Sequence, residues 1–306
     1  MIVQLILLAF TALLLPGYLL FALVARRETS VLRWLLKLLY TGALVVYVFL
    51  AARWDRLSIY LRYLWLGLYV AAAVLSYTRL RGAPFVVADE GRRRLGAVSY
   101  AFTLLIAFLF LGLAVRARSH ADQPVRLELP FQDGRYYVAH AGWDMGLGHR
   151  EGSLSRRHGV SFVQLNSFGA RARGLFPADL RAYVIFGRTV HSPCDGTVTA
   201  AADGIPDRRP LEVDARYPAG NHVVISCQNV DLLLAHLQSG SVAVEAGQRV
   251  ESGQVLGRVG NSGATREPRL YIHAVDGGTA SVFEGEPVPV LFDLRYPARN
   301  RVFVGD

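Results

Sequence analysis

The sequence is nearly devoid of lysine and poor in cysteine. Of its 33 basic residues only Lys37 is a lysine, and its 306 residues include just two cysteines. Chemistry that depends on a lysine amine is therefore excluded from the whole chain after residue 37. The two cysteines, Cys194 and Cys227, cannot form a cysteine-rich zinc finger. The long apolar runs of the first half hold no acidic residue at depth, so nothing indicates an ion pathway there.

The formal net charge of +9 does not indicate a nucleic-acid-binding protein. Many of the arginines flank apolar runs, where membrane topology accounts for them. The other arginines are scattered singly over the second half of the chain and form no basic stripe. We therefore expect a membrane as a partner and no nucleic acid.

The first part of the chain contains four apolar runs, each long enough to cross about 30 Å of hydrocarbon as a helix. The first run is too long for a cleavable signal peptide and lacks a charged start. These features predict an N-terminal all-α transmembrane region of four helices. The runs are Ile2–Ala25, Leu32–Ala52, Ser58–Tyr77 and Ala97–Val115.

The distribution of arginine predicts how these spans are oriented. The loop after the third run holds most of the loop arginines, which places the first and third loops in the cytoplasm and both chain ends outside it. Lys37 and Arg62 lie near the ends of their runs, and we expect their charged groups to reach the membrane interface.

From Leu127 onward, short alternating runs separated by Gly, Asn, Asp and Pro are typical of an antiparallel all-β domain. We divide the chain into an anchor (1–115), a linker (116–126) and a β-domain (127–306). About ten linker residues reach roughly 35 Å at most, which keeps the domain near the membrane. Strands are expected at Arg135–Ala139, Val160–Leu165, Thr197–Ala201, His222–Ser226, Val230–His236 and Leu270–Ala274.

Several short motifs in the β-domain resemble one enzyme family. They include Ser-Pro-Cys-Asp-Gly-Thr-Val, Gly-Asn-His-Val-Val-Ile, Ala-His-Leu, Gly-Asn-Ser-Gly and Glu-Pro-Arg-Leu-Tyr-Ile-His-Ala, all between residues 183 and 274. This pattern is similar to the M23 metallopeptidases, the LytM and lysostaphin group, which cut peptidoglycan cross-bridges with zinc. The resemblance implies an M23-like antiparallel sheet related to barrel-sandwich hybrids. The run 244–257 also resembles a biotinyl or lipoyl carrier, but the absence of lysine excludes cofactor attachment.

The same resemblance assigns places for three zinc ligands, and two of them are occupied by weak ligands. His149 is the best match for the first ligand, although a solvated loop histidine is an equally good interpretation. The second place, an aspartate in the family, is Ser161, and the third, the last residue of a His-x-His pair, is Tyr271. A hydroxyl binds zinc poorly beside a carboxylate, and a phenol ionises only at about pH 10. Arg269 occupies the first position of the pair and adds positive charge.

Other residues belong to the vestigial groove that the resemblance implies. His236 is retained in Ala-His-Leu, where a structural role is favoured over a ligand contact, and Asn221 and Asn261 are expected to line the groove. His273 shares a strand face with Tyr271 and is the residue around which a rebuilt zinc site would form, with His149, His158 or His236. A serine hydrolase built on Ser161 and His236 lacks the required Gly-x-Ser-x-Gly turn.

The two cysteines are candidates for a disulfide because the β-domain is expected outside the cytoplasm. If Ala201 lies opposite about Gly220 in a hairpin, antiparallel counting places Cys194 opposite Cys227. Two buried free thiols are the alternative.

These observations favour a multi-pass protein of the bacterial inner membrane with a degenerate M23 domain outside the cytoplasm. We expect no zinc cofactor, no peptidase activity, and binding to peptidoglycan or to an envelope protein. In the LytM group degenerate members activate wall hydrolases, so the resemblance implies such a regulatory role. The alternatives are an active zinc endopeptidase with a rebuilt site and a structural subunit of a membrane complex.

Overall fold

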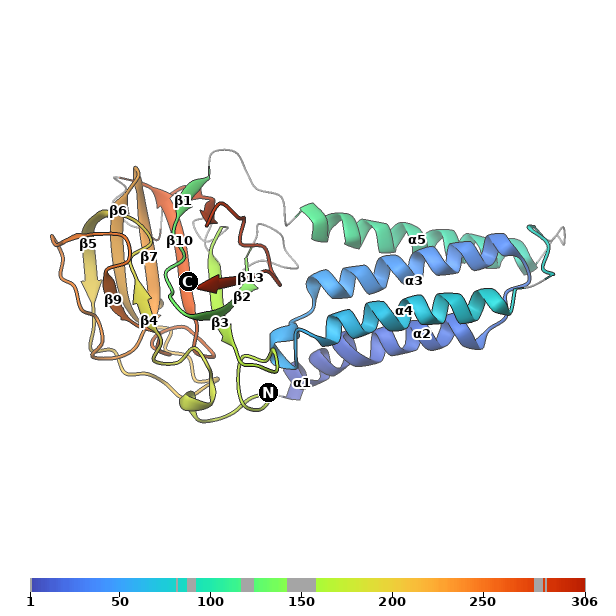
Figure 1. Cartoon of the computed structure of the whole chain (residues 1–306), viewed down its shortest axis with the longest axis horizontal. Coiled ribbons are helices and arrows are strands. Elements are labelled where there is room, and N and C mark those ends of the chain that lie inside the picture. The colour runs from blue at the N-terminus through green and yellow to red at the C-terminus, as the bar shows by residue number, and fades with distance from the viewer. Residues whose placement is uncertain are drawn as a thin grey trace. The chain divides into compact units, whose positions relative to one another are not determined.

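The computed structural model describes residues 2–80, 82–86, 92–116, 124–141, 158–277, 283 and 285–305 (Figure 1). It divides the chain into two compact units. The first comprises Met1–Trp54 and Ser58–Arg116, and the second comprises Asp55–Leu57 and Ala117–Asp306. The main boundary thus falls one residue beyond the end of the predicted anchor.

The first unit is helical, as the apolar runs predict. It contains four helices that are long and apolar enough to cross a membrane, over Leu5–Ala25, Val31–Ala51, Leu61–Thr78 and Val98–Arg116. A five-residue π-helical turn interrupts the first of them just before Pro16, whose missing N–H breaks the regular hydrogen-bond ladder. The elements are α1 (Ile2–Ala9), the π-turn (Phe10–Leu14), α2 (Leu15–Ala25), α3 (Val31–Ala51), a 3-10 turn (Trp54–Arg56), α4 (Leu61–Thr78) and α5 (Arg92–Arg116).

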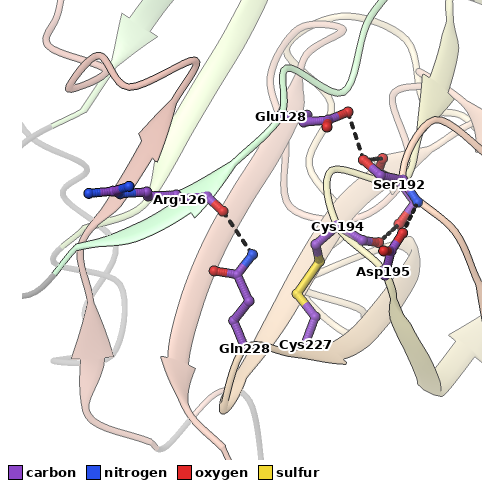
Figure 2. Close-up of a disulfide and its surroundings, with 8 residues drawn as sticks. Arg126, Glu128, Ser192, Cys194, Asp195, Cys227 and Gln228 are labelled. Atoms are coloured by element: carbon purple, nitrogen blue, oxygen red, sulfur yellow. Dashed lines mark hydrogen bonds between the residues drawn. A yellow bond between two sulfur atoms is a disulfide. The ribbon is translucent and has the colours of Figure 1, made fainter.

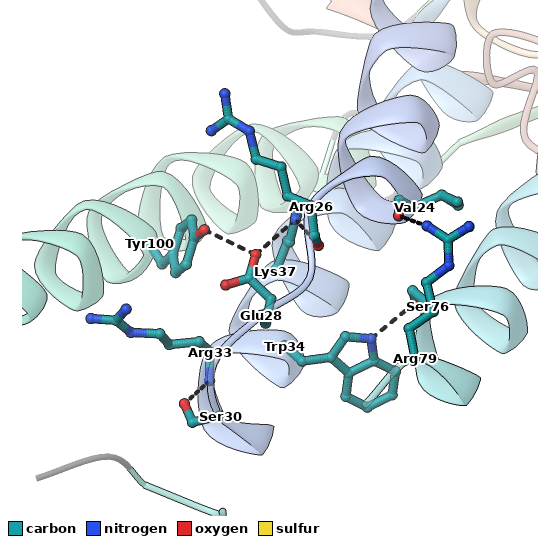
Figure 3. Close-up of polar contacts among 10 residues, drawn as sticks. All are labelled: Val24, Arg26, Glu28, Ser30, Arg33, Trp34, Lys37, Ser76, Arg79 and Tyr100. Carbon is teal, nitrogen blue, oxygen red and sulfur yellow. Dashed lines mark hydrogen bonds and ion pairs between the residues drawn. The ribbon is translucent and has the colours of Figure 1, made fainter. Parts of the chain in front are cut away.

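Lys37 reaches past the start of α3 into the loop before it, and there its amine is paired rather than left to water. Its amine donates to Glu28 Oε1 at 2.7 Å and to the carbonyl oxygen of Arg26 at 3.4 Å, and Tyr100 on α5 donates to the same carboxylate oxygen (Figure 3). The Lys37 and Glu28 side chains are only 3% and 9% exposed. An ion pair at the start of α3 therefore replaces hydration of the amine, because an opposite charge lies within reach.

The second unit is built around one antiparallel sheet with the strand order β13-β2-β3-β10-β7-β6-β5-β8, and β11 pairs with β10 beside this path (Figure 1). Two small sheets pair β1 with β12 and β4 with β9. The central strands are β2 (Gly134–His140), β3 (Val160–Leu165), β5 (Gly196–Ala202), β6 (Asn221–Cys227), β7 (Val230–Leu237) and β10 (Leu270–Asp276). All six strands that the sequence predicts are present, each within two residues of its expected ends.

The shorter strands were not expected from the sequence. They are β1 (Val125–Leu127), β4 (Thr189–His191), β8 (Arg249–Val250), β9 (Val255–Arg258), β11 (Pro287–Val288), β12 (Val290–Phe292) and β13 (Val302–Gly305). Strands of two to four residues are too short for an alternating pattern to emerge. Because β1 begins at Val125, the last two residues of the predicted linker already belong to the β-domain.

The central sheet buries apolar side chains on both of its faces. The larger cluster includes Phe162, Ile225, Leu232, Leu234 and Ile272, and it forms the main core. The opposite face carries a smaller cluster of Ala219, Val224, Leu233, Ala235, Tyr271 and Val275. Successive residues of a strand point to opposite faces, so β7 and β10 contribute alternately to the two clusters. The second, smaller face is the one that carries the candidate site.

A disulfide joins Cys194 to Cys227, with the two Cα atoms 6.5 Å apart (Figure 2). The sequence-based register that suggested this bond is wrong by three residues, because Ala201 pairs with Val223 rather than with a residue near Gly220. Cys194 precedes β5 and reaches Cys227 from the loop rather than from a continued ladder. The bond fastens the entry of β5 to the end of β6.

Candidate functional site

The two weak-ligand places of the sequence meet in the folded domain. Ser161 on β3 is the direct cross-strand partner of Tyr271 on β10, and Tyr271 is in turn opposite Ala235 on β7. Ser161 is fully buried and Tyr271 is 6% exposed. Direct partners in antiparallel strands point to the same face with their Cβ atoms about 5 Å apart. An aspartate and a histidine at these two positions would therefore be close enough to hold one metal ion.

The ring of Tyr271 packs against Gly159, the residue immediately before β3. A Cβ atom on Gly159 would lie 2.7 Å from Cε2 and 2.8 Å from Cζ of the tyrosine ring. Such contacts are far inside van der Waals distance, so only glycine permits the ring to lie there. The phenol thus fills a position against the backbone beside Ser161.

A β-bulge directs His236 toward the same site. Asn221 pairs with Leu237 and His222 pairs with Ala235, which makes His236 the extra residue of β7. The backbone of His236 has a φ of 68°, and its N–H donates to the carbonyl oxygen of Ala219 at 2.9 Å. Bulges commonly re-aim a side chain in this way. The imidazole ring lies 6.1 Å from the Tyr271 ring, centroid to centroid.

Ser262 fixes the orientation of that imidazole. His236 Nδ1 lies 2.9 Å from the carbonyl oxygen of Ser262, and a carbonyl oxygen can only accept. The proton of a neutral ring is therefore on Nδ1 and its lone pair is on Nε2. The Ser262 hydroxyl donates to the Leu237 carbonyl oxygen and accepts from the Asn221 N–H, which holds the strand ends together. Ser262 belongs to the motif Gly-Asn-Ser-Gly, but the motif alone does not indicate this role.

The remaining candidate residues differ in their placement. His273 is fully buried, and its ring lies 5.4 Å from the ring of Tyr271, so the face carries two imidazoles around one phenol. Arg269 is half-buried immediately before β10. His149 lies outside the described residues.

The two asparagines predicted to line the groove have structural roles. The Asn221 amide donates to the carbonyl oxygens of Ile205 and Leu237, and its oxygen accepts from the Ile205 N–H. Asn261 donates its amide to the carbonyl oxygen of Arg208. Both side chains thus hold the loop between β5 and β6. Burial raises the pKa of Asp207 in that loop, partly offset by N–H donors of Asn261 and Ser239.

The donor set beside β3 and β10 does not fit a zinc ion. A hydrolytic zinc site needs three good protein ligands and an open position for water. At the two adjoining places the chain offers a hydroxyl and a phenol, and the ring of Tyr271 is packed against Gly159. Among the residues that the structure describes, no three His, Cys, Asp or Glu side chains are grouped as metal ligands.

A comparison with family models finds a match within the β-domain. Residues 179–282 match the model of peptidase family M23. This segment is similar to the M23 peptidases. The match covers β4 to β10, and therefore His236, Ser262, Arg269, Tyr271 and His273.

Solved structures similar to the chain include two peptidases and one chain of a pore-forming complex. Lysostaphin from Staphylococcus simulans is 18% identical, with a TM-score of 0.28 over 42% of this chain and 40% of that one. A zinc-containing peptidase from Vibrio cholerae is 21% identical, with a TM-score of 0.29 over 50% of this chain and 41% of that one. The SpoIIQ–SpoIIIAH pore-forming complex contributes a chain that is 16% identical, with a TM-score of 0.33 over 54% of this chain and 95% of that one.

The chain thus spans about 40% of the length of the lysostaphin chain that it matches. No curated protein matches it.

Proposed function

We propose that this is a multi-pass inner-membrane protein whose M23 domain lies outside the cytoplasm and binds peptidoglycan peptides without cutting them. One observation carries the proposal. Ser161 and Tyr271 are direct cross-strand partners at the two adjoining ligand places, and the Tyr271 ring packs against Gly159. The resemblance assigns these positions to two zinc ligands, and a hydroxyl and a phenol there are poor ligands, which supports binding without hydrolysis. A site of this kind keeps the groove as a recognition surface.

The groove chemistry supports a peptide ligand. His236 and Arg269 bring an imidazole and a guanidinium, side chains of the kind that bind peptide carbonyls and carboxylates. Tyr271, whose ring lies 6.1 Å from that of His236, adds an aromatic group. Donor, acceptor and apolar groups together match the mixed character of a wall peptide.

Binding to purified peptidoglycan by the full-length protein in detergent tests this proposal. We expect Arg269→Gln to weaken binding by about fivefold, since it removes a charge-assisted donor. Arg266→Gln is the matched control, because it removes an equal charge from the same loop at an exposed position. Undetectable binding by the unmodified protein, or equal losses in the two variants, would contradict the peptide-binding function. Capture of an envelope protein in place of peptidoglycan would transfer the role to a protein ligand.

A restoration series tests the reason for the lost activity. Ser161→Asp with Tyr271→His places a carboxylate and an imidazole on adjoining strands, and we expect a gain in zinc affinity of at least about tenfold. Arg269→His should then be required for any hydrolysis of wall peptides. The double variant Ser161→Gln, Tyr271→Phe is the control, because neither glutamine nor phenylalanine is a good zinc ligand. An equal zinc affinity in both double variants would show that these strands are not the ligand places.

A second candidate function is a zinc endopeptidase rebuilt around His273. It is favoured by the burial of His273 and by the proximity of its ring to that of Tyr271. The step from Tyr271 to His273 is about 7 Å along the strand, so the metal would occupy a new position. Loss of chelator-sensitive cleavage in His273→Ala, with cleavage by the unmodified protein, would establish this alternative.

A further inference from the structure

An open cavity of about 480 Å³ lies in the β-domain, away from the residues of the M23 groove. It forms where the segment from Ala182 to Arg188 passes Asn166, just after the end of β3. Three arginines line it, Arg173, Arg181 and Arg188, and no acidic residue is among its lining residues. Neither Ser161 nor Tyr271 contributes to its walls, so the cavity is a separate feature of the domain.

The three arginines carry their charge without a carboxylate partner in the described part of the chain. All three are exposed, and the ion pairs of the domain engage other arginines, such as Arg171 with Glu267 at 2.7 Å. The neighbouring Asp179 uses its carboxylate to accept the backbone N–H of Arg181, as the cap of a 3-10 turn. Three like charges within about one Debye length of each other repel, and a bound anion would relieve that repulsion.

The backbone around the cavity is held in place before any ligand arrives. The N–H of Arg173 donates to the carbonyl oxygen of Ala182 at 2.9 Å, and Ala172 is bridged to Tyr183. The N–H of Gly187 donates to the carbonyl oxygen of Val259 at 2.8 Å, which anchors the turn before Arg188. The segments that carry the arginines are therefore fixed, and only the side chains need to be ordered on binding.

The lining of the cavity also includes Asn166. The Asn166 side-chain oxygen accepts a hydrogen bond from the Ala170 N–H at 3.0 Å, which stabilises the turn after β3. Its Nδ2 group carries two N–H donors. The lining thus brings three arginines and one side-chain amide to one cavity, and the planar guanidinium of arginine can donate to two phosphate or carboxylate oxygens at once.

We propose that this cavity binds a phosphate group, presented either by an anionic lipid headgroup or by a soluble phosphate ester. Phosphate suits three arginines around one cavity better than a carboxylate does, because it offers three or more acceptor oxygens and a charge of up to about −2. The inference does not depend on the fate of the zinc site or on peptide binding by the groove.

Calorimetric titration of the full-length protein in a neutral detergent tests the proposal. The probes are inorganic pyrophosphate and dihexanoyl phosphatidylglycerol, with dihexanoyl phosphatidylcholine as the neutral lipid. The triple variant Arg173→Gln, Arg181→Gln, Arg188→Gln should bind the phosphate probe at least about tenfold more weakly. The matched control is Arg209→Gln, Arg249→Gln, Arg266→Gln, which removes the same charge from exposed positions outside the cavity.

The expected result is binding of a phosphate probe that the cavity variant loses and the control variant retains. Binding of phosphatidylglycerol alone assigns the cavity to lipid headgroups, and binding of pyrophosphate, with or without the lipid, assigns it to accessible phosphate groups in general. Equal losses in the two triple variants would attribute binding to net charge and overturn the proposal. Binding of neither phosphate probe, or equal binding of phosphatidylcholine, would overturn it as well.

Discussion

Reduction of the Cys194–Cys227 bond should destabilise the β-domain by a predictable amount. The bond closes a loop with a sequence separation of 33 residues. In the chain-entropy model a loop of this length contributes about 3.7 kcal/mol at 25 °C, because the bond restricts the unfolded chain. For a domain of roughly 150–250 residues, a loss of that size lowers the midpoint of thermal unfolding by about 7–15 °C.

Pulse proteolysis of the heated full-length protein, with immunodetection of a C-terminal tag, reports unfolding of this domain. We expect a midpoint shift of that size when reductant is added to the unmodified protein. The double variant Cys194→Ala, Cys227→Ala should unfold at the lower midpoint and should not respond to reductant. Both cysteines are buried, at 4% and 6% exposure, so the variant also loses a little packing. An unchanged midpoint in the reduced unmodified protein would refute the contribution assigned to the bond.

Three further predictions concern topology, pH and the helical unit. A reporter that is active only outside the cytoplasm, fused to the C-terminus, should be active, and activity of a cytoplasm-only reporter would refute the orientation. Burial lowers the pKa of His191, which favours the neutral ring in the folded state, so the stability of the domain should fall as pH drops below about 6.5. The melting midpoint of His191→Asn should therefore fall less than that of the unmodified protein between about pH 7 and about pH 5. An equal fall in both proteins would contradict this prediction. Lys37→Met leaves the Glu28 carboxylate buried without its cation and should lower the free energy of unfolding by about 3–5 kcal/mol. Adding Glu28→Gln should recover part of that loss. A double variant no more stable than Lys37→Met would contradict the ion pair.

Much of the fold follows from local sequence patterns. The four apolar runs and the six longer strands are recognisable because each continues its pattern over enough residues. Local patterns do not predict the short strands or the correct register of the hairpin that ends at Cys227. Register is set by a bulge between Val198 and Ala200 and by the long loop between β5 and β6, neither of which leaves a periodic signal.

The candidate site was predictable in part. The motif spacing placed Ser161 and Tyr271 at corresponding ligand positions, and the strand register brings them together. The roles of Asn221, Asn261 and Ser262 depend on contacts between segments distant in sequence, which a motif cannot reveal. The pairing of Lys37 with Glu28 is likewise not visible in the sequence, because it depends on how the loop before α3 folds back onto that helix.

Zinc content of the purified full-length protein tests the central claim most directly. Elemental analysis after dialysis against zinc-containing and then zinc-free buffer should give well below one zinc per chain, because a hydroxyl and a phenol occupy the places opposite each other on β3 and β10. The same preparation should leave peptidoglycan peptides uncut. One zinc per chain, together with cleavage that a chelator abolishes, would contradict the account.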